Sequence, residues 1–573
     1  MDVYLQVLSA ASSWFDGASP HAVAELLALL LPLLPLDERA RAACVCRAWR
    51  TAAAHPALWD TLRFERGGVR GTDATLAALC ACARAALRTL YLDADACNRV
   101  TADGLVTALR DSGCVGLRRL VAQRQVHWNN FTLSFGGKQV ALLAAACPLL
   151  EYTACVVDSD GVYREMLTAL PGPLEFYCFV PDGGDEAQAS QLAECLRGST
   201  SVTSLGFRFY RDGAAVVAQL ADYLRVNTTV TALDLSDNNG VGDAGATALA
   251  ECLLVNAALK SLDLDGTGIG DVGGTALAES LRVNTTLTSL ELCGNDIGGE
   301  GAAQLAACLR VNATLTSLGL DCNRRLGDEG ATQLAACLRV NATLKSLRLG
   351  YCGMGNEGVA QLSDSLRVNA TLTGLDLHHN DIGAAGATVL ADRLRVNTAL
   401  TSLDLSQNEI CDEGATHLAE CLRVNATLKS LDLAWSSIRD EGVAQLAASL
   451  HVNATLTCLG LDCNRHIDDE SATQLAACLR VNATLTSLRL GYCGIGNEGA
   501  AQLADSLRVN ATLTSLDLHH NDIGAAGATV LADCLRVNTA LTSLDLSLNG
   551  ISDVGALHLA ECLRVNPTLE IRR

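Results

Sequence analysis

Apolar residues over most of the chain follow a plan that repeats every 28 or 29 residues. Within residues 312–340, the segment "NATLTSLGLDCN" alternates apolar positions at Leu318 and Leu320, which predicts a short strand. The segment "EGATQLAACLRV" then combines Leu334 and Leu338 with small alanines at the spacing of one helix face. Each period therefore predicts one strand followed by one helix, and neither element can bury its apolar face without neighbours.

A Val-Asn pair at the end of each predicted helix marks this period along the chain. Its thirteen valines are Val226, Val255, Val283, Val311, Val340, Val368, Val396, Val424, Val452, Val481, Val509, Val537 and Val565. The Asn of the pair leaves the helix, a position where Asn tolerates left-handed backbone geometry. Stacked units place their strands about 4.8 Å apart, and the bulkier helices lie outside. The predicted fold class is therefore an α/β solenoid, a curved horseshoe with parallel strands inside and helices outside.

The predicted strands carry a recurring motif, Leu-x-x-Leu-x-Leu-x-x-Asn/Cys. One copy uses Leu315, Leu318, Leu320 and Asn323, and the next copy ends in Cys352. This motif is that of the leucine-rich repeat. The long period resembles the ribonuclease-inhibitor subtype, which also occurs in NLR receptors and in the Ran GTPase-activating protein. The resemblance covers residues 201–573 and implies the fold, but such frames carry many different functions.

Residues 67–200 are less regular than the rest of the array. The segment "LRTLYLDADACNRVTADGLVTAL" at residues 87–109 still fits one leucine-rich repeat, with strand leucines Leu90 and Leu92. The segment "ACPLLEYTACVV" at residues 146–157 fits another. We therefore interpret residues 67–200 as irregular leucine-rich repeats that precede the regular array of residues 201–573.

Residues 19–66 have a different pattern, which predicts a small all-α domain of three short helices. Pro20 can start the first helix, and the side chain of Asp37 can cap the second. So few residues bury only a small core, and the domain gains from a partner.

This segment resembles an F-box in "LLPL" at residues 33–36, "VCRAWR" at residues 45–50 and "PALW" at residues 56–59. The resemblance implies that the domain docks onto the adaptor subunit of a cullin–RING ubiquitin ligase. The residues implied in that contact are Leu33, Pro35, Leu36, Val45, Trp49, Leu58 and Trp59.

The formal net charge of −21 changes the expected partners. Residues 1–70 hold seven basic and seven acidic residues, so the whole acidic surplus belongs to the repeats. Such a surface disfavours nucleic acid and anionic membranes, and it suits a protein partner with a basic surface. An acidic surplus also serves plain solubility, and the sequence leaves both explanations open.

Two features bear on the compartment. The apolar stretch "AVAELLALLLPLLPL" at residues 22–36 is too short to span a membrane, contains Glu25 and follows an acidic start. The 24 cysteines are spread along a chain without a predicted export signal, which favours a reducing compartment. We therefore expect a cytoplasmic location, or a nuclear one as well.

The sequence contains no phosphate loop, nucleophile elbow or Cys-His protease signature, so it predicts no enzyme and no cofactor. Cys293, Cys322 and Cys463 are predicted near His378 and His519, but no two-cysteine knuckle supports a zinc site. We therefore predict no resident metal.

The predicted inner surface carries two rows of residues that suit protein binding. The first row lies between the paired strand leucines and is mainly acidic, whereas the second lies two positions after the second leucine and is rich in aromatic residues. Aromatic side chains on a concave wall are typical binding anchors; shielding of the strand ends is the alternative. The predicted partner-binding residues are Asp234, Asp263, Glu291, Tyr351, Asp376, His379, Asp404, Asp432, Trp435, Tyr492 and Asp517.

An internal duplication is also visible. The 62-residue segments Leu347–Asn408 and Leu488–Asn549 are offset by 141 residues and differ at six positions. Their likeness reports the history of the chain as well as any physical need.

These observations favour a substrate-receptor subunit of an SCF-type cullin–RING ubiquitin ligase. In that hypothesis the F-box docks the adaptor, and the concave repeat face binds the target protein. One alternative is a non-ligase interaction scaffold that resembles ribonuclease inhibitor or an NLR sensor, although an NLR needs a nucleotide-binding domain with a phosphate loop. A second alternative is a Ran-type GTPase activator, which acts by positioning and needs no nucleophile motif.

Overall fold

The computed structural model describes residues 61–64, 73–93, 100–123, 152–156, 174–179, 202–208 and 213–572, with six further residues at 143, 145–147, 149 and 150. The predicted adaptor-binding residues Leu33, Pro35, Leu36, Val45, Trp49, Leu58 and Trp59 all lie outside the described residues. The chain divides into two compact units, Met1–Gly240 (unit 1) and Val241–Arg573 (unit 2). Among the described residues, no helix has both the length and the apolar composition that a membrane span requires.

The described part of unit 1 is a parallel sheet with helices between several of its strands. Its strands are β1 (Thr61–Phe64), β2 (Thr89–Asp93), β3 (Arg119–Gln123), β4 (Tyr152–Val156), β5 (Leu174–Phe179), β6 (Val202–Arg208) and β7 (Ala232–Asp234), each paired with the next. Its helices are α5 (Asp73–Ala83), η3 (Arg84–Ala86), α6 (Ala102–Asp111) and α10 (Gly213–Leu224). β2 and α6 are the strand and helix expected from residues 87–109, and β4 lies within the second predicted repeat.

One described segment differs from the all-α structure expected for residues 19–66. Residues 61–64 were included in the all-α domain of residues 19–66, but they form strand β1 and pair with β2. Leu62 aligns with Leu90, and both side chains are fully buried. The alternation of apolar and polar residues in "TLRF" explains this result, because it gives a strand one buried face.

Unit 2 repeats one strand and one helix along its whole length, which confirms the predicted α/β solenoid. Its strands are β8 (Ser261–Asp263), β9 (Ser289–Glu291), β10 (Ser317–Gly319), β11 (Ser346–Arg348), β12 (Gly374–Asp376), β13 (Ser402–Asp404), β14 (Ser430–Asp432), β15 (Cys458–Gly460), β16 (Ser487–Arg489), β17 (Ser515–Asp517), β18 (Ser543–Asp545) and β19 (Glu570–Arg572). Its helices are α11 (Gly242–Leu253), α12 (Asp271–Leu281), α13 (Gly299–Leu309), α14 (Gly327–Leu338), α15 (Asn356–Leu366), α16 (Ala384–Leu394), α17 (Cys411–Leu422), α18 (Asp440–Leu450), α19 (Asp469–Leu479), α20 (Asn497–Leu507), α21 (Ala525–Leu535) and α22 (Asp553–Val565).

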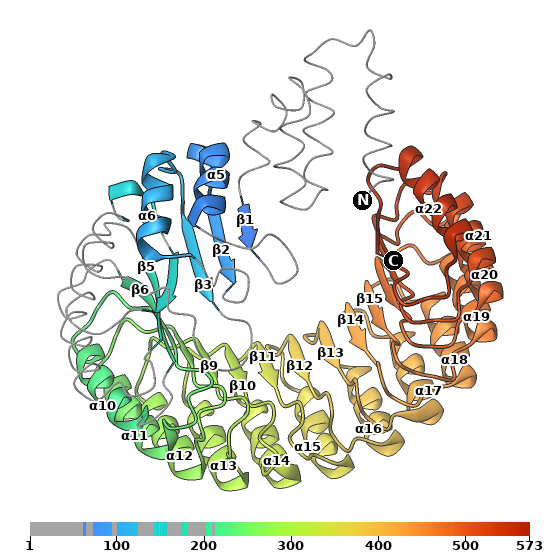
Figure 1. Ribbon diagram of the computed structural model, residues 1–573. Helices are drawn as coiled ribbons and strands as arrows, with labels where there is room; N and C mark the ends of the chain where they lie inside the picture. Colours follow the sequence, from blue (N-terminus) through green and yellow to red (C-terminus); the bar gives the residue numbers. More distant parts are fainter. Residues whose placement is uncertain are drawn as a thin grey trace. The chain divides into compact units, whose positions relative to one another are not determined.

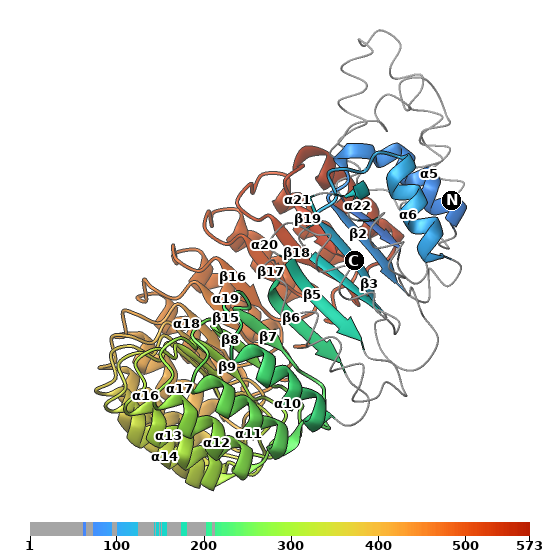
Figure 2. The same ribbon diagram turned by 90° about the vertical axis from the view of Figure 1, so that its left-hand side faces the viewer.

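The strands of unit 2 line the inner side of a curve and its helices form the outer side (Figure 1). Each strand pairs in parallel with the next, so that Leu318, Leu347 and Leu375 stand in one row. These leucines are at most 3% exposed. In the side view, the helices of consecutive repeats lie next to one another in chain order (Figure 2). The core is therefore a continuous layer between strands and helices.

Asparagines at two positions of most repeats connect neighbouring repeats. In the strand motif, the Nδ2 of Asn323 donates to the carbonyls of Leu292 and Leu320, at 2.9 and 2.8 Å, and its Oδ1 accepts from the Ile297 N–H at 3.0 Å. In the Val-Asn pair, the Nδ2 of Asn312 donates to the Leu281 carbonyl at 2.8 Å, in the preceding repeat. These Asn residues therefore satisfy buried backbone groups that the short strands and helix ends leave open.

The expectation of left-handed geometry at the Asn of the Val-Asn pair was wrong. Described residues with positive φ do not include Asn312 or its equivalents. The Oδ1 of Asn312 instead accepts from the backbone N–H of Thr314 and Leu315, at 3.0 and 2.8 Å. The amide therefore holds the chain as it enters the next strand, and this bonding explains the Asn.

Several helices of unit 2, namely α12, α13, α15, α16, α18, α20 and α21, begin with a cap from a side chain of the preceding helix. Helix α15 has no side-chain cap of its own, but Oδ1 of Asp328 in α14 accepts from the N–H groups of Gly355 and Gly358, both at 2.8 Å. A Cβ at residue 358 would lie 2.5 Å from that oxygen, so the position requires glycine. The same bonding recurs between other neighbouring helices, for example from Asp469 to Gly496 and Gly499.

The motif asparagine should contribute more to stability than the cysteine that replaces it in other repeats. Asn380 bonds the carbonyls of Leu349 and Leu377 and the N–H groups of Cys352 and Met354, at 2.9–3.1 Å. Asn380→Ala leaves these buried groups unpaired, which typically costs about 1–3 kcal/mol per group. We expect a clear fall in the urea midpoint of unfolding. Cys352→Ala is the matched control, since its thiol makes only weak sulfur bonds, and equal shifts for both variants would contradict this account.

Candidate functional site

The acidic residues predicted between the strand leucines have a structural task as well as a surface position. The Oδ1 atoms of Asp376, Asp404, Asp432 and Asp517 each accept from the backbone N–H two residues ahead, at 2.8–3.1 Å. Asp263 does the same in β8, and so does Asp234 in unit 1. The carboxylates therefore hold the turns that end the strands. The side chains of Asp376, Asp432 and Asp517 remain 25, 21 and 27% exposed, so part of each carboxylate faces solvent.

Two arginines neutralise part of this acidic row. The Nε of Arg348 lies 2.7 Å from Oδ2 of Asp321, and its Nη2 lies 3.1 Å from Oε2 of Glu291, two repeats away. Gly319 lies between them in β10, and a Cβ there would overlap the Glu291 carboxylate and crowd the guanidinium. The glycine in the acidic row therefore makes room for the arginine to cross a whole repeat.

The same arrangement recurs five repeats later. The Nε of Arg489 lies 2.7 Å from Oδ2 of Asp462, and its Nη2 bonds Asp432. Gly460 provides the space. Of the predicted acidic residues, Glu291 and Asp432 are thus already paired with arginine, and in unit 1 Asp234 lies 3.6 Å from Arg208. Asp376 and Asp404 have no arginine ion pair within the described residues. Of their copies Asp517 and Asp545, Asp545 has a longer one, with Arg572 at 4.0 Å.

Burial and neighbouring charges tune the first acidic pair. Burial raises the pKa of the Asp404 carboxyl, and the nearby Asp432 and Asp376 raise it further, although bonds from Ser406 act the other way. Oδ1 of Asp376 accepts a hydrogen bond from Nδ1 of His378 at 2.7 Å, and this bond is the main cause of the raised pKa of His378. No ion pair to Asp404 is found within the described residues, so this carboxylate gains most from an external cation.

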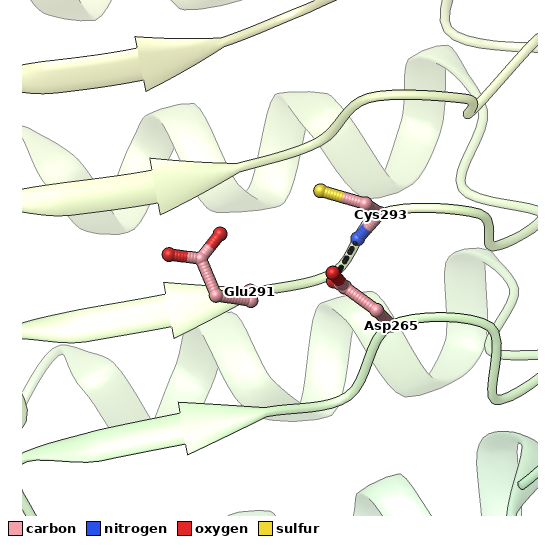
Figure 3. A group of neighbouring side chains, drawn as sticks. All are labelled: Asp265, Glu291 and Cys293. Atoms are coloured by element: carbon pink, nitrogen blue, oxygen red, sulfur yellow. Dashed lines mark hydrogen bonds between the residues drawn. The ribbon is translucent and has the colours of Figure 1, made fainter. Parts of the chain in front are cut away.

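A group of Asp265, Glu291 and Cys293 has the residue types of a metal site (Figure 3). The Cys293 N–H donates to Oδ1 of Asp265 at 2.6 Å, and Nη2 of Arg348 lies 2.7 Å from the Cys293 sulfur. A metal needs a thiolate, but burial, helped by Asp321 and Asp265, raises the pKa of the Cys293 thiol far above its usual range. The guanidinium of Arg348 therefore occupies the place of a cation, and the group is an ion-pair network.

Two further groups combine a histidine with two aspartates, namely Asp321, Asp376 and His378, and their copies Asp462, Asp517 and His519. In each group the first aspartate already bonds an arginine, through Arg348 or Arg489. These arginines compete with any metal for the carboxylate oxygens. The expectation that the chain holds no metal is not tested by the structure and stays a prediction.

The predicted aromatic row lies in the turns after the strands and not on the strands themselves. Tyr351, His379, Trp435 and Tyr492 have φ angles of 54, 48, 54 and 56°. Two earlier repeats place Gly266 and Gly294 at the equivalent position, and both also have positive φ. The backbone alone therefore favours glycine here, and a bulky residue in this region costs about 1–3 kcal/mol. Strain of this kind is typical of positions whose side chains have a function.

The aromatic residues form two matched clusters with an arginine that was not predicted. The Arg324 guanidinium lies 4.0 Å from the centroid of the Tyr351 ring, and that ring lies 4.1 Å from the ring of His379. The Nδ1 of His379 lies 2.5 Å from Oε1 of Gln407. Arg324 follows the strand-motif Asn in the text "DCNR", which recurs at Arg465, so this repetition was the available signal.

In the second cluster, the guanidinium of Arg465 lies 4.8 Å from the Tyr492 ring, which lies 4.2 Å from the ring of His520. Trp435 stacks on Tyr492 with ring centroids 6.2 Å apart, and its side chain is 48% exposed. Arg465, Tyr492, His520, Asp522 and Leu548 line a cleft of about 410 Å³. The structure thus joins charged and aromatic groups in a surface suited to a protein side chain.

The repeat architecture and this surface are typical of leucine-rich-repeat proteins that bind other proteins. A family model described as the NLRC3 LRR domain matches residues 237–572, more than half of the chain, so the chain belongs to this family of leucine-rich-repeat domains. A second model, described as F-box-like, matches residues 24–65. Modules of these two kinds are typical of protein–protein interaction. The comparison with curated proteins gave no match.

Two solved structures similar to parts of the chain have low overall likeness. The leiomodin-1 actin-binding site 2 is 24% identical, and the match covers 27% of this chain and 88% of that chain, with a TM-score of 0.24. An internalin from Listeria monocytogenes str. 4b F2365 is 20% identical, and the match covers 63% of this chain and 93% of that chain, with a TM-score of 0.36. Likeness at this level carries no functional argument.

The histidine–aspartate bond predicts a measurable titration. Asp376→Asn should lower the pKa of His378, measured by NMR, because it removes the carboxylate that stabilises the imidazolium. The stabilisation from this pair is fully present below about pH 6.5, the usual histidine pKa. It is lost as the pH rises through the raised pKa of the folded state. Asp404→Asn, which removes only a distant charge, should lower the pKa of His378 less. The opposite ranking would show that the bond is not the main cause.

Proposed function

We propose that this protein is the substrate-receptor subunit of an SCF-type cullin–RING ubiquitin ligase. The observation that supports this most is the presence, in one chain, of an F-box-like match at residues 24–65 and a leucine-rich-repeat domain at residues 237–572. In this proposal the chain catalyses nothing itself. It brings a target close to the ubiquitin-loaded enzyme and so raises the effective concentration of that target. The proposed location is cytoplasmic, or nuclear as well.

The proposal divides the chain between two partners. The adaptor subunit binds the F-box-like segment through Leu33, Pro35, Leu36, Val45, Trp49, Leu58 and Trp59. The target binds unit 2 through the strand and turn surface. The acidic pairs of unit 2 and the net charge of −21 favour a target with a basic surface.

A second candidate is a non-ligase interaction scaffold that resembles ribonuclease inhibitor or an NLR sensor. The match to the NLRC3 LRR domain favours it, because that match covers far more of the chain than the F-box-like one. A leucine-rich-repeat frame does not by itself decide function, so adaptor binding is what separates the two candidates. A Ran-type GTPase activator is a weaker alternative.

The ligase proposal predicts direct binding of the full chain to the purified SCF adaptor. Leu36→Ala and Trp49→Ala should each weaken this binding at least about fivefold, because truncation of a buried anchor typically costs more than about 1 kcal/mol. Asp404→Lys in unit 2 is the control and should leave adaptor binding unchanged. Equal binding by the wild type and the double variant would remove the ligase proposal and leave the scaffold.

The target-binding surface predicts a loss of capture when its charge is reversed. The triple variant with Asp376→Lys, Asp404→Lys and Asp432→Lys should retain fewer cellular proteins than the wild type, as counted by mass spectrometry after affinity purification. Asp432→Lys also places two cations together at Arg489, so the double variant without it is the cleaner test. Added salt should weaken capture by the wild type. If neither the charge reversal nor added salt reduced the number of captured proteins, electrostatic recognition would be excluded.

A further inference from the structure

The duplicated segments of unit 2 differ mostly away from the strand and turn surface. The six differing pairs are Met354 and Ile495, Val359 and Ala500, Ser363 and Ala504, Gly374 and Ser515, Arg393 and Cys534, and Gln407 and Leu548. The first three side chains are fully buried, and the fifth pair lies on helices α16 and α21. Only Gly374/Ser515 and Gln407/Leu548 change the strand and turn surface.

The two copies share several contacts and differ in two. His379 bonds Gln407, whereas Leu548 takes the place of that glutamine beside His520. Trp435 stacks on Tyr492, whereas Gly294 stands at the matching place near Tyr351. The arginine clamps both have Nε–Oδ2 distances of 2.7 Å, at Arg348 and Arg489. The histidine–aspartate bonds measure 2.7 Å at His378 and 2.8 Å at His519. The tyrosine–histidine ring centroids are 4.1 and 4.2 Å apart. Two surfaces that share these side chains and distances suit the same class of ligand, with affinities that differ through Trp435 and Leu548.

We define patch A as Asp376, Asp404, Tyr351 and His379, and patch B as Asp517, Asp545, Tyr492 and His520. Each patch combines two carboxylates outside the clamps of Arg348 and Arg489 with a tyrosine–histidine ring pair. In patch B, Oδ2 of Asp545 also lies 4.0 Å from Nη1 of Arg572, a side chain that is 85% exposed. A lysine or arginine side chain suits both parts, because it is attracted to the carboxylates and can lie over an aromatic face. The cleft of about 410 Å³ beside Tyr492 and His520 gives an adjacent bulky side chain a place to enter.

The distance between the patches follows from the sheet. Patch A contains residues of β12 and β13, and patch B the equivalent residues of β17 and β18, so the patches are five strands apart. At about 4.8 Å per strand, their separation is about 24 Å. Every strand between them pairs with the next in unbroken register, which keeps this separation constant.

We propose that unit 2 carries two related docking sites, patch A and patch B, for one recognition element, a short protein segment with a basic and an aromatic side chain. A partner with two such segments, or a dimeric partner, engages both sites at once. This proposal rests on the proposed function, in that the strand and turn surface binds protein. The new parts are the number of binding sites on that surface, two, and the chemistry of the segment that each site binds. Because the second contact is intramolecular, a two-segment partner binds far more tightly than either segment alone.

The test uses synthetic peptides and the full chain. The single probe contains one Arg-Trp-Arg element. The double probe joins two elements by about 20 Gly/Ser residues, whose average span of about 25 Å matches the patches. A double probe with a two-residue linker reaches less than about 8 Å and cannot bridge them. Isothermal titration should give two single probes per chain, and the long double probe should bind about 100-fold more tightly, at one per chain.

Variants assign the two binding events to the patches. Asp376→Asn with Asp404→Asn removes the charge of patch A but keeps an oxygen for the turn bonds, and Asp517→Asn with Asp545→Asn does the same for patch B. Each double variant should bind one single probe and lose the linker advantage, and the combination should bind none. The matched control is Asp392→Asn with Asp533→Asn, which changes equivalent exposed residues on α16 and α21, and it should behave as the wild type.

The other outcomes overturn the proposal. One single probe per wild-type chain, or complete loss of binding in either patch variant alone, would mean a single site. Equal affinity of the long and short double probes would mean that the sites do not act together. If the wild-type chain bound no probe, the patches would not recognise a segment with a basic and an aromatic side chain. None of these results affects adaptor binding, so failure of this proposal is distinguishable from failure of the ligase proposal.

Discussion

Hydrogen bonds from buried side chains to the backbone of the adjacent repeat are the constraint on which this structure depends. Three-residue strands and short helices leave many polar backbone groups without partners inside their own repeat. Asn323, Asn312 and Asp328 satisfy such groups in a neighbour. A buried unpaired N–H or carbonyl is expensive, so a repeat taken out of the stack would lose these bonds as well as its apolar contacts. The stack is the smallest stable unit, and its regularity keeps the recognition residues in register.

The fold could be predicted from the sequence because its signals are local and repeated. The alternation around Leu318 and Leu320 and the helical spacing of Leu334 and Leu338 hold in almost every period. A weak pattern in one period is therefore supported by the same pattern in the others. The reason for the Asn of the Val-Asn pair was missed, because its bond to Leu281 spans 31 residues. The strand at residues 61–64 was also missed, since four residues are too few to separate a strand from the end of a helical domain.

The candidate site was only partly predictable. The acidic row and the aromatic row were found by register, but the sequence could not show that Arg348 crosses Gly319 to reach Glu291, 57 residues away. Nor did it show that the aromatic residues adopt left-handed geometry, since Tyr, His and Trp rarely do so. Both features follow from how neighbouring repeats lie against one another. The two glycines in the acidic row were the available clue, since a side chain is absent where another must pass.

The capping of several helices by the helix before them gives the array a direction. The carboxylate of Asp328 in α14 accepts from N–H groups at the start of α15, so the cap of α15 depends on α14 being present. A repeat that has already folded therefore presents its successor with a prepared anchor for the first turn, the step that is hardest for an isolated helix. Synthesis on the ribosome delivers repeats in the same order. The array can thus grow by templated addition while it is being made, whereas growth from the opposite end would have to begin helices such as α15 and α20 without their caps.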